Sequence, residues 1–232
     1  MKEIYRLSEF ERGDFYSLSN KIVLNQIIHQ KDFSECNIRQ VDFSNCIFDG
    51  TCFPWTKCED LTFERCILKN ASFKKSELEN FIFKNCQLTN INFARSDLMD
   101  FDFINCKLEN VDFSAGELMD LKFYNSQLQD VYFLGSLLDN VKIKHSTLET
   151  IRFDGSEVYK EIYKNGELIA IRTPINDYAS FLIASDPLLL EGSVMFEYKD
   201  DKVLKQVMIF FTIVTSIAYC LLKPDILELL LS

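Results

Sequence analysis

Apolar residues recur at every fifth position over more than half of the chain, without a single insertion. A helix returns to one face every 3.6 residues and a strand every two, so neither element keeps a five-residue period on one face. The pattern therefore predicts a repeat architecture. The apolar centres are Phe33, Ile38, Phe43, Phe48, Phe53, Cys58, Phe63, Leu68, Phe73, Leu78, Phe83, Leu88, Phe93, Leu98, Phe103, Leu108, Phe113, Leu118, Phe123, Leu128, Phe133, Leu138, Ile143, Leu148, Phe153 and Val158.

The residue two places before each centre follows a second rule. It is small before most of the aliphatic centres, as at Ser96 and Cys106, and mostly bulky before the Phe centres, as at Ile91 and Val111. The full unit is therefore ten residues long. Cys46, Cys66, Cys86 and Cys106 occupy the small position at intervals of twenty residues. We expect them to be reduced, buried filler rather than disulfides or metal ligands.

Stretches such as Cys106 to Asn110 and Val111 to Ala115 resemble the pentapeptide-repeat family. Its consensus is a small residue, Asp or Asn, a central Leu or Phe, and two polar residues. The resemblance covers about residues 31–158. It implies an all-β solenoid, a right-handed quadrilateral β-helix in which four units make one coil, so that residues twenty apart stack.

Stacking at this interval predicts four columns inside the coil. Phe33 to Phe153 form one column, Phe43 to Phe123 the opposite one, and Leu or similar residues fill the other two. About 6.5 coils at the usual strand spacing would span roughly 31 Å. Phe81 and Phe101 depart from the consensus, because they are bulky where the family usually keeps small residues.

Asp or Asn recurs two residues after many of the centres. Such side chains hydrogen-bond the local backbone at turns, and we expect them to form ladders from coil to coil. Only 7 Gly and 4 Pro occur in the chain, which predicts that loops with special backbone angles are scarce. The turn residues are Asp60, Asn70, Asn80, Asn90, Asp100, Asn110, Asp120, Asp130 and Asn140.

Outside the repeat the pattern changes, and this divides the chain into five parts. Residues 1–30 are predicted to be an N-terminal cap and a degenerate first coil, and residues 31–158 the β-helix. Apolar runs on either side of Asn165-Gly166 predict a capping hairpin over 159–173. An irregular connector, 174–202, and an apolar segment, 203–232, complete the chain.

The apolar segment contains a run from Val207 to Leu222 without any charge. A helix of this run would be about 24 Å long and would show almost no polar stripe. We therefore predict that residues 203–222 insert into a lipid membrane as a single-pass C-terminal anchor, with the β-helix at its cytoplasmic face. No signal peptide is evident in Met1 to Phe10. The alternatives are a protein-buried or homodimer-forming helix in a cytoplasmic protein, and an artefact of truncation.

Composition and motifs argue against catalysis. The net charge of -10 and the pI near 4.8 exclude direct nucleic-acid binding through clustered Lys and Arg. The chain has two histidines, His29 and His145, and no phosphate loop, paired-His metal motif or nucleophile elbow. The sequence thus predicts a protein that is not an enzyme, with no catalytic, cofactor-binding or metal-binding residues and no cofactor.

Carboxylates are numerous between residues 97 and 120, and they indicate either a solvated exterior or an acidic face for a basic partner. Two functions follow. The first is a membrane-tethered scaffold that binds an unidentified protein through the faces of the β-helix. The alternative is implied by resemblance to the quinolone-resistance members of the family, acidic DNA mimics that bind gyrase or topoisomerase and protect it from quinolones. The carboxylates are Asp97, Asp100, Asp102, Glu109, Asp112, Glu117 and Asp120.

Overall fold

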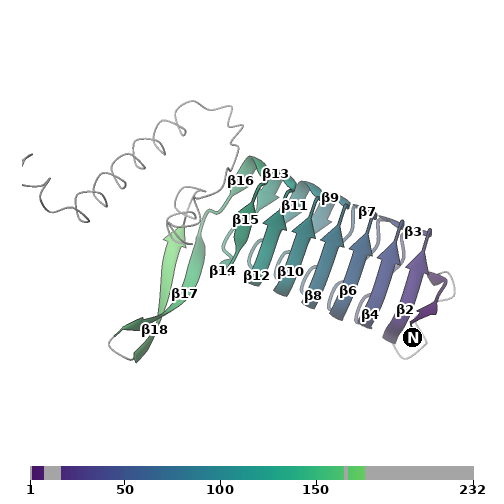
Figure 1. Cartoon of the computed structure of the whole chain (residues 1–232), viewed down its shortest axis with the longest axis horizontal. Helices are drawn as coiled ribbons and strands as arrows, with labels where there is room; N and C mark the ends of the chain where they lie inside the picture. The colour runs from purple at the N-terminus through teal and green to yellow at the C-terminus, as the bar shows by residue number, and fades with distance from the viewer. Residues whose placement is uncertain (1, 8–16, 165–166, 176–232) are drawn as a thin grey trace, which may run out of the picture. The chain divides into compact units, whose positions relative to one another are not determined.

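β-Strands, nearly all of them parallel, make up most of the part of the chain that the computed structural model describes, residues 2–7, 17–164 and 167–175 (Figure 1). Strands of successive coils pair with partners twenty residues away, as in Leu98 with Leu118 and Phe103 with Phe123. They form one eleven-stranded and one seven-stranded sheet. The fold is an all-β parallel solenoid of about seven coils, consistent with the predicted β-helix. Its right-handed sense stays a prediction.

Each coil contributes one strand, in places split in two, to each sheet. The eight-residue strands of the larger sheet bend around a corner, so that β10 directs Leu98 inward before the bend and Phe103 after it. The larger sheet contains β1 (Glu3–Ile4), β2 (Ser17–Leu24), β4 (Asn37–Ser44), β6 (Lys57–Glu64), β8 (Glu77–Lys84), β10 (Asp97–Ile104), β12 (Glu117–Tyr124), β14 (Leu137–Asp139), β15 (Lys142–Lys144), β17 (Ser156–Lys164) and β18 (Glu167–Ile175). The smaller sheet contains β3 (Ile27–His29), β5 (Ile47–Asp49), β7 (Ile67–Lys69), β9 (Gln87–Asn92), β11 (Lys107–Asp112), β13 (Gln127–Tyr132) and β16 (Thr147–Arg152).

Two columns of stacked Phe rings form the centre of the solenoid, as the twenty-residue interval predicts. Phe93 is fully buried between Phe73 and Phe113, with ring centroids 5.0 and 5.1 Å away. In the second column, the Phe83 and Phe103 rings are 5.0 Å apart and nearly parallel. Rings of the two columns meet edge to face, an arrangement that aromatic quadrupoles favour.

Phe81 and Phe101 add a third, short stack instead of disrupting the coil. Both side chains are fully buried, and their centroids lie 4.7 Å apart with an interplanar angle of 7°. Phe101 also meets the Phe93 ring edge to face at 6.1 Å. The solenoid therefore accommodates a large residue in this slot when the next coil supplies a second ring.

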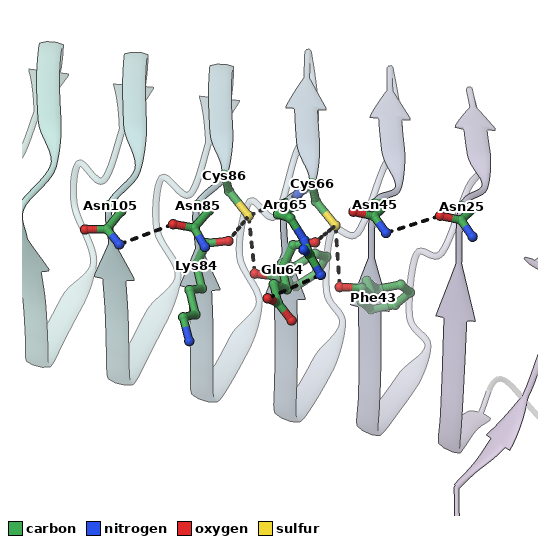
Figure 2. Close-up of polar contacts among 11 residues, drawn as sticks. Asn25, Phe43, Asn45, Glu64, Arg65, Cys66, Lys84, Asn85, Cys86 and Asn105 are labelled. Atoms are coloured by element: carbon green, nitrogen blue, oxygen red, sulfur yellow. Dashed lines mark hydrogen bonds and ion pairs between the residues drawn. The ribbon is translucent and has the colours of Figure 1, made fainter.

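The small residues before the aliphatic centres form buried hydrogen bonds with main-chain carbonyl groups. The Ser96 hydroxyl donates to the carbonyl of Phe73 at 2.6 Å, and the Cys86 thiol donates to the carbonyl of Phe63 at 3.2 Å. Figure 2 shows Cys66 and Cys86 directed toward main-chain oxygens in this way. Since buried polar groups need partners, a small donor suits this slot better than a purely apolar residue would.

Left-handed backbone angles occur at the corners of nearly every coil, at intervals of five residues. A single coil has four such corners, for example Asn80, Asn85, Asn90 and Arg95, all with φ between 55 and 61°. The prediction that special backbone angles are scarce is therefore wrong. Polar residues rather than Gly hold most of these corners, because Asn and Asp tolerate the left-handed region and bond locally.

Corner side chains form the expected ladders, and a further ladder that the turn list did not include. Asn90 donates to Asn70 and Asn110 to Asn90, both at 2.9 Å. Along another corner, Asn45 donates to Asn25 and Asn105 to Asn85, each at 3.2 Å. Figure 2 shows that Arg65 interrupts this second ladder; its guanidinium lies 3.5 Å from Glu64 instead.

At the C-terminal end, β17 pairs antiparallel with β18 and parallel with β14. The turn Asn165-Gly166 lies outside the described residues, so the capping hairpin over 159–173 stays a prediction. The connector beyond residue 175 and the segment 203–232, with its predicted anchor at 203–222, also lie outside them. Within the described part of the chain, no helix has the length and apolar character needed to cross a membrane.

Candidate protein-binding surface

The described part of the interior contains buried thiols. Burial raises the pKa of the Cys58 thiol well above its usual range. A hydrogen bond with Cys106, together with burial, raises the pKa of Cys86 to about 12. Of the seven cysteines in the described part, six are buried and only Cys52 is exposed. The thiols of Cys58 and Cys86 are therefore protonated at neutral pH, and in that state they are poor nucleophiles and poor metal ligands.

The two histidines lie on the surface in different coils. His29 in β3 places its Nδ1 3.3 Å from an Asp49 carboxylate oxygen. His145 occupies a corner and meets the Tyr124 ring edge to face at 5.3 Å. Over the described ranges, no three His, Cys, Asp or Glu side chains are grouped so that they could hold a metal ion.

The structure sorts the carboxylates of residues 97–120 onto different sides of the solenoid. Asp97 and Asp100 in β10 share one side with Glu117 and Asp120 in β12. Three others lie elsewhere: Asp102 is on the next side, 3.5 Å from Lys122; Glu109 in β11 is 3.3 Å from Lys107; and Asp112 accepts the Ser114 amide. The predicted acidic face is therefore built from four of the seven residues.

We call one side of the solenoid the acidic side. It consists of the outward residues of the first halves of β6, β8, β10 and β12 and of β14, each together with the corner that follows. From Glu59 onward, every charged residue here is acidic up to Asp139. The members are residues 57, 59, 60, 77, 79, 80, 97, 99, 100, 117, 119, 120, 137, 139 and 140.

Among the described residues, basic groups meet the acidic side only at its edges. Lys57 lies at its N-terminal end, 2.9 Å from Glu77, and this hydrogen bond raises the pKa of the lysine. Lys75 and Arg95 occupy the preceding corner, where the Lys75 ammonium lies 4.4 Å from the centroid of the exposed Trp55 ring. The centre of the acidic side, over β10 and β12, therefore keeps its negative charge largely unpaired.

Two exposed methionines lie in the middle of this negative surface. Met99 and Met119 are partners in the pairing of β10 with β12, and these residues are 41% and 40% exposed. Carboxylates surround them, since Glu79 and Asp139 follow in register in the adjacent coils. Methionine is flexible and polarizable and is favoured at surfaces that bind other proteins.

This surface is not evident along the linear sequence, because its members are spread over more than eighty residues. The twenty-residue period nevertheless indicates it. Ranking the residues by their place in the twenty-residue coil brings Glu77, Asp97 and Glu117 into one column and Asp100 and Asp120 into another. Counting charge along the chain mixed these residues with Asp102, Glu109 and Asp112, which face other directions.

A comparison with known protein families identifies the repeat. The sequence profile of the pentapeptide repeat region matches residues 24–93 and 76–153, which together cover more than half of the chain. The chain therefore belongs to the pentapeptide-repeat family. No curated protein matches it.

Several solved structures are similar at low identity. A trypsin-treated variant of QnrB1, a plasmid-mediated fluoroquinolone resistance protein, is 16% identical; the match covers 68% of this chain and 92% of that one, with a TM-score of 0.33. HetL, involved in heterocyst differentiation regulation in the cyanobacterium Nostoc sp. strain PCC 7120, is 14% identical over 60% and 71% of the chains, with a TM-score of 0.27. At these levels the likeness says nothing about function.

Proposed function

We propose that this pentapeptide-repeat protein is a non-enzymatic scaffold that binds another protein through the outer surface of its β-helix. The observation that carries the proposal is the contrast between a filled, hydrogen-bonded interior and an outer side with exposed methionines among largely unpaired carboxylates. Solenoids commonly bind partners through such extended surfaces. An exposed apolar patch within a polar rim is typical of protein-binding sites.

We also propose that the scaffold is tethered to a membrane through residues 203–222, which leaves the β-helix on the cytoplasmic side. The uncharged run Val207–Leu222 supports this, since its apolar length approaches that of a bilayer core. Lys202 and Lys205 precede the run and only Lys223 follows it directly, a bias that favours a cytoplasmic location for the N-terminal part. A homodimer formed by this segment is the competing arrangement.

Fractionation of the full chain beside a chain that ends at Asp201 tests both parts. We expect the full chain in the membrane fraction and the shortened chain in the soluble fraction, with the same co-purifying protein on both. A soluble full chain that dimerises only when the segment is present would overturn the tether. If neither form retains a protein above the level of a β-helix of unrelated surface, the scaffold function is wrong.

The alternative of a gyrase-binding DNA mimic has no observation of its own that favours it over the scaffold. Its charge excess is confined mainly to one side, and methionines interrupt that side where DNA would present further phosphates. A supercoiling assay with purified gyrase decides the matter, because a DNA mimic must inhibit the enzyme or protect it from a quinolone. Absence of both effects excludes the alternative.

A further inference from the structure

The width of the acidic side matches the diameter of one α-helix. Its methionine column runs between two columns of carboxylates, one through Asp97 and Glu117 and the other through Asp100 and Asp120. Three residues separate the two columns along the strand, a distance of about 10 Å in extended chain. An α-helix with its side chains is about 10–12 Å wide. A helix over Met99 and Met119 would therefore have carboxylates along both flanks.

The repeat along the solenoid axis also suits a helix. Adjacent parallel strands lie about 4.8 Å apart, so negative groups follow one another at that interval from Glu77 to Glu117 in one column and from Asp100 to Asp120 in the other. A helix advances about 4.5 Å in three residues and about 6 Å in four. Lys or Arg at such spacings can therefore follow successive coils, since their long side chains absorb the remaining difference.

We propose that the acidic side binds a basic amphipathic α-helix of a partner protein, laid along the solenoid axis. Apolar residues of the helix pack on Met99 and Met119, and its Lys and Arg residues pair with the flanking carboxylates. This inference rests on the proposed scaffold function and specifies the partner of that function. The negative charge of the acidic side favours a positively charged partner, and the exposed methionines require that partner to have an apolar face.

Other occupants fit this surface less well. Strand addition requires a free sheet edge, whereas β10 and β12 lie inside the larger sheet with neighbours on both sides. An extended chain also repeats on one face about every 6.7 Å, which does not match the coil spacing. Anionic lipid surfaces and nucleic acids would be repelled. A second copy of this chain also fits less well, because its basic cluster of Lys122, Lys142 and Lys144 lies on strands rather than on a helix.

Binding of designed peptides to the full chain in a mild non-ionic detergent tests the proposal. The probe is a fluorescent helical peptide with Lys at three- and four-residue spacings on both sides of a Leu stripe. One control is a scrambled peptide of the same composition that lacks the stripe; the other is an oligolysine of equal charge. We expect the amphipathic peptide to bind at least about tenfold more tightly than either control, and more weakly as salt rises.

Two variants of the acidic side identify the surface used. Asp97→Asn, Asp100→Asn, Glu117→Gln and Asp120→Asn together remove four charges, and Asn already holds the equivalent corner at Asn80. We expect this variant to lose about tenfold in affinity. Met99→Gln with Met119→Gln removes the apolar column and should cost about fivefold. Circular dichroism and thermal melting check that both variants keep the fold.

A matched variant removes four charges from the opposite sheet, through Asp49→Asn, Glu109→Gln, Asp130→Asn and Glu149→Gln. We expect it to bind the amphipathic peptide within about twofold of the parent, since surface charges at a distance are largely screened. Equal losses in this variant and in the acidic-side variant would show general charge attraction and overturn the proposal.

The remaining outcomes are equally decisive. Oligolysine that binds as tightly as the amphipathic peptide, or methionine variants that leave affinity unchanged, would overturn helix docking. Light scattering that shows a dimer lost on neutralising the acidic side would identify a second copy as the occupant, also against the proposal. The scaffold function is judged separately: a co-purifying protein retained by the neutralised variant would support that function while placing its site elsewhere.

Discussion

The inward and outward faces of a single strand, β10, follow different rules. Inward, Leu98, Phe101 and Phe103 are buried and are continued in the next coil by residues that pack on them. Outward, Asp97 and Met99 are exposed, and the side chains at their places change between acidic, apolar and polar from coil to coil. The interior is thus held uniform by stacking, whereas the exterior carries the features that distinguish one coil from another. Substitutions on either face test this difference between the interior and the exterior.

The largest effect should come from placing a charge in the ring stack. Phe93→Asp would bury an unpaired carboxylate between Phe73 and Phe113, at a cost of about 4 kcal/mol or more, and should unfold the coil. Thr89→Lys is the control, because Thr89 is only partly buried and lies one residue after a centre. Chemical denaturation followed by circular dichroism measures both. Similar midpoints for the two variants would contradict the stacked core.

Thiol reactivity should also differ between the inward and outward faces. Cys86 and Cys106 are buried, whereas Cys52 faces outward and is exposed. With a maleimide reagent, we expect Cys52 to react at least about a hundredfold faster than either, because the buried thiols react only when the coil opens. Mass spectrometry of timed samples gives the rates. Rapid native labelling of Cys86, or a native disulfide between these cysteines, would show that the column is open or oxidised.

A smaller effect is expected at Gly116, where the main chains of two adjacent coils lie very close together. The Cβ of an alanine at Gly116 would overlap the main-chain oxygen of Ser96, so Gly116→Ala should cost about 1–3 kcal/mol. Gly135→Ala is the matched control, since no atom lies within 4 Å of its Cβ and only the left-handed φ of 64° opposes it. Thermal unfolding compares them. A control that is destabilised more than Gly116→Ala would place the strain in the corner.

The smallest effect should come from a corner. Asn105 has a φ of 54°, donates to Asn85 and accepts from Asn125. Asn105→Ala should cost about 1–2 kcal/mol, because alanine resists the left-handed region and the ladder is lost. Asn105→Gly separates the two causes, since glycine loses the ladder but keeps the angle. Equal losses in free energy of unfolding for both variants would attribute the stability to the ladder alone.

The interior could be predicted from the sequence because a strict period leaves little choice of packing. Burial of Phe93 between Phe73 and Phe113 follows from the twenty-residue interval alone and is confirmed. The corners were predicted less well. Scarcity of Gly suggested few left-handed residues, but Asn and Asp supply that geometry here together with a hydrogen bond to the next coil.

The acidic side was only partly predictable, because charge along the chain does not say which way a side chain faces. Glu109 lies close to Asp97 in sequence yet belongs to the other sheet, where Lys107 lies 3.3 Å from it. Met99 and Met119 carry no sign of exposure by themselves, since methionine is equally at home in cores. Only the register that pairs these two residues brings them together among carboxylates.

The uninterrupted five-residue spacing makes insertion and deletion act as geometric operations. Removing twenty residues would translate everything beyond the cut by one coil, about 4.8 Å along the axis, and leave each side with its own chemistry. Removing five would instead rotate that part by one side, so that the Asp102 and Ile104 side would continue the row of Glu77 and Glu79. Coil duplications should therefore lengthen the binding track, whereas shorter changes of five residues should rewrite its charge pattern while keeping apolar residues inside.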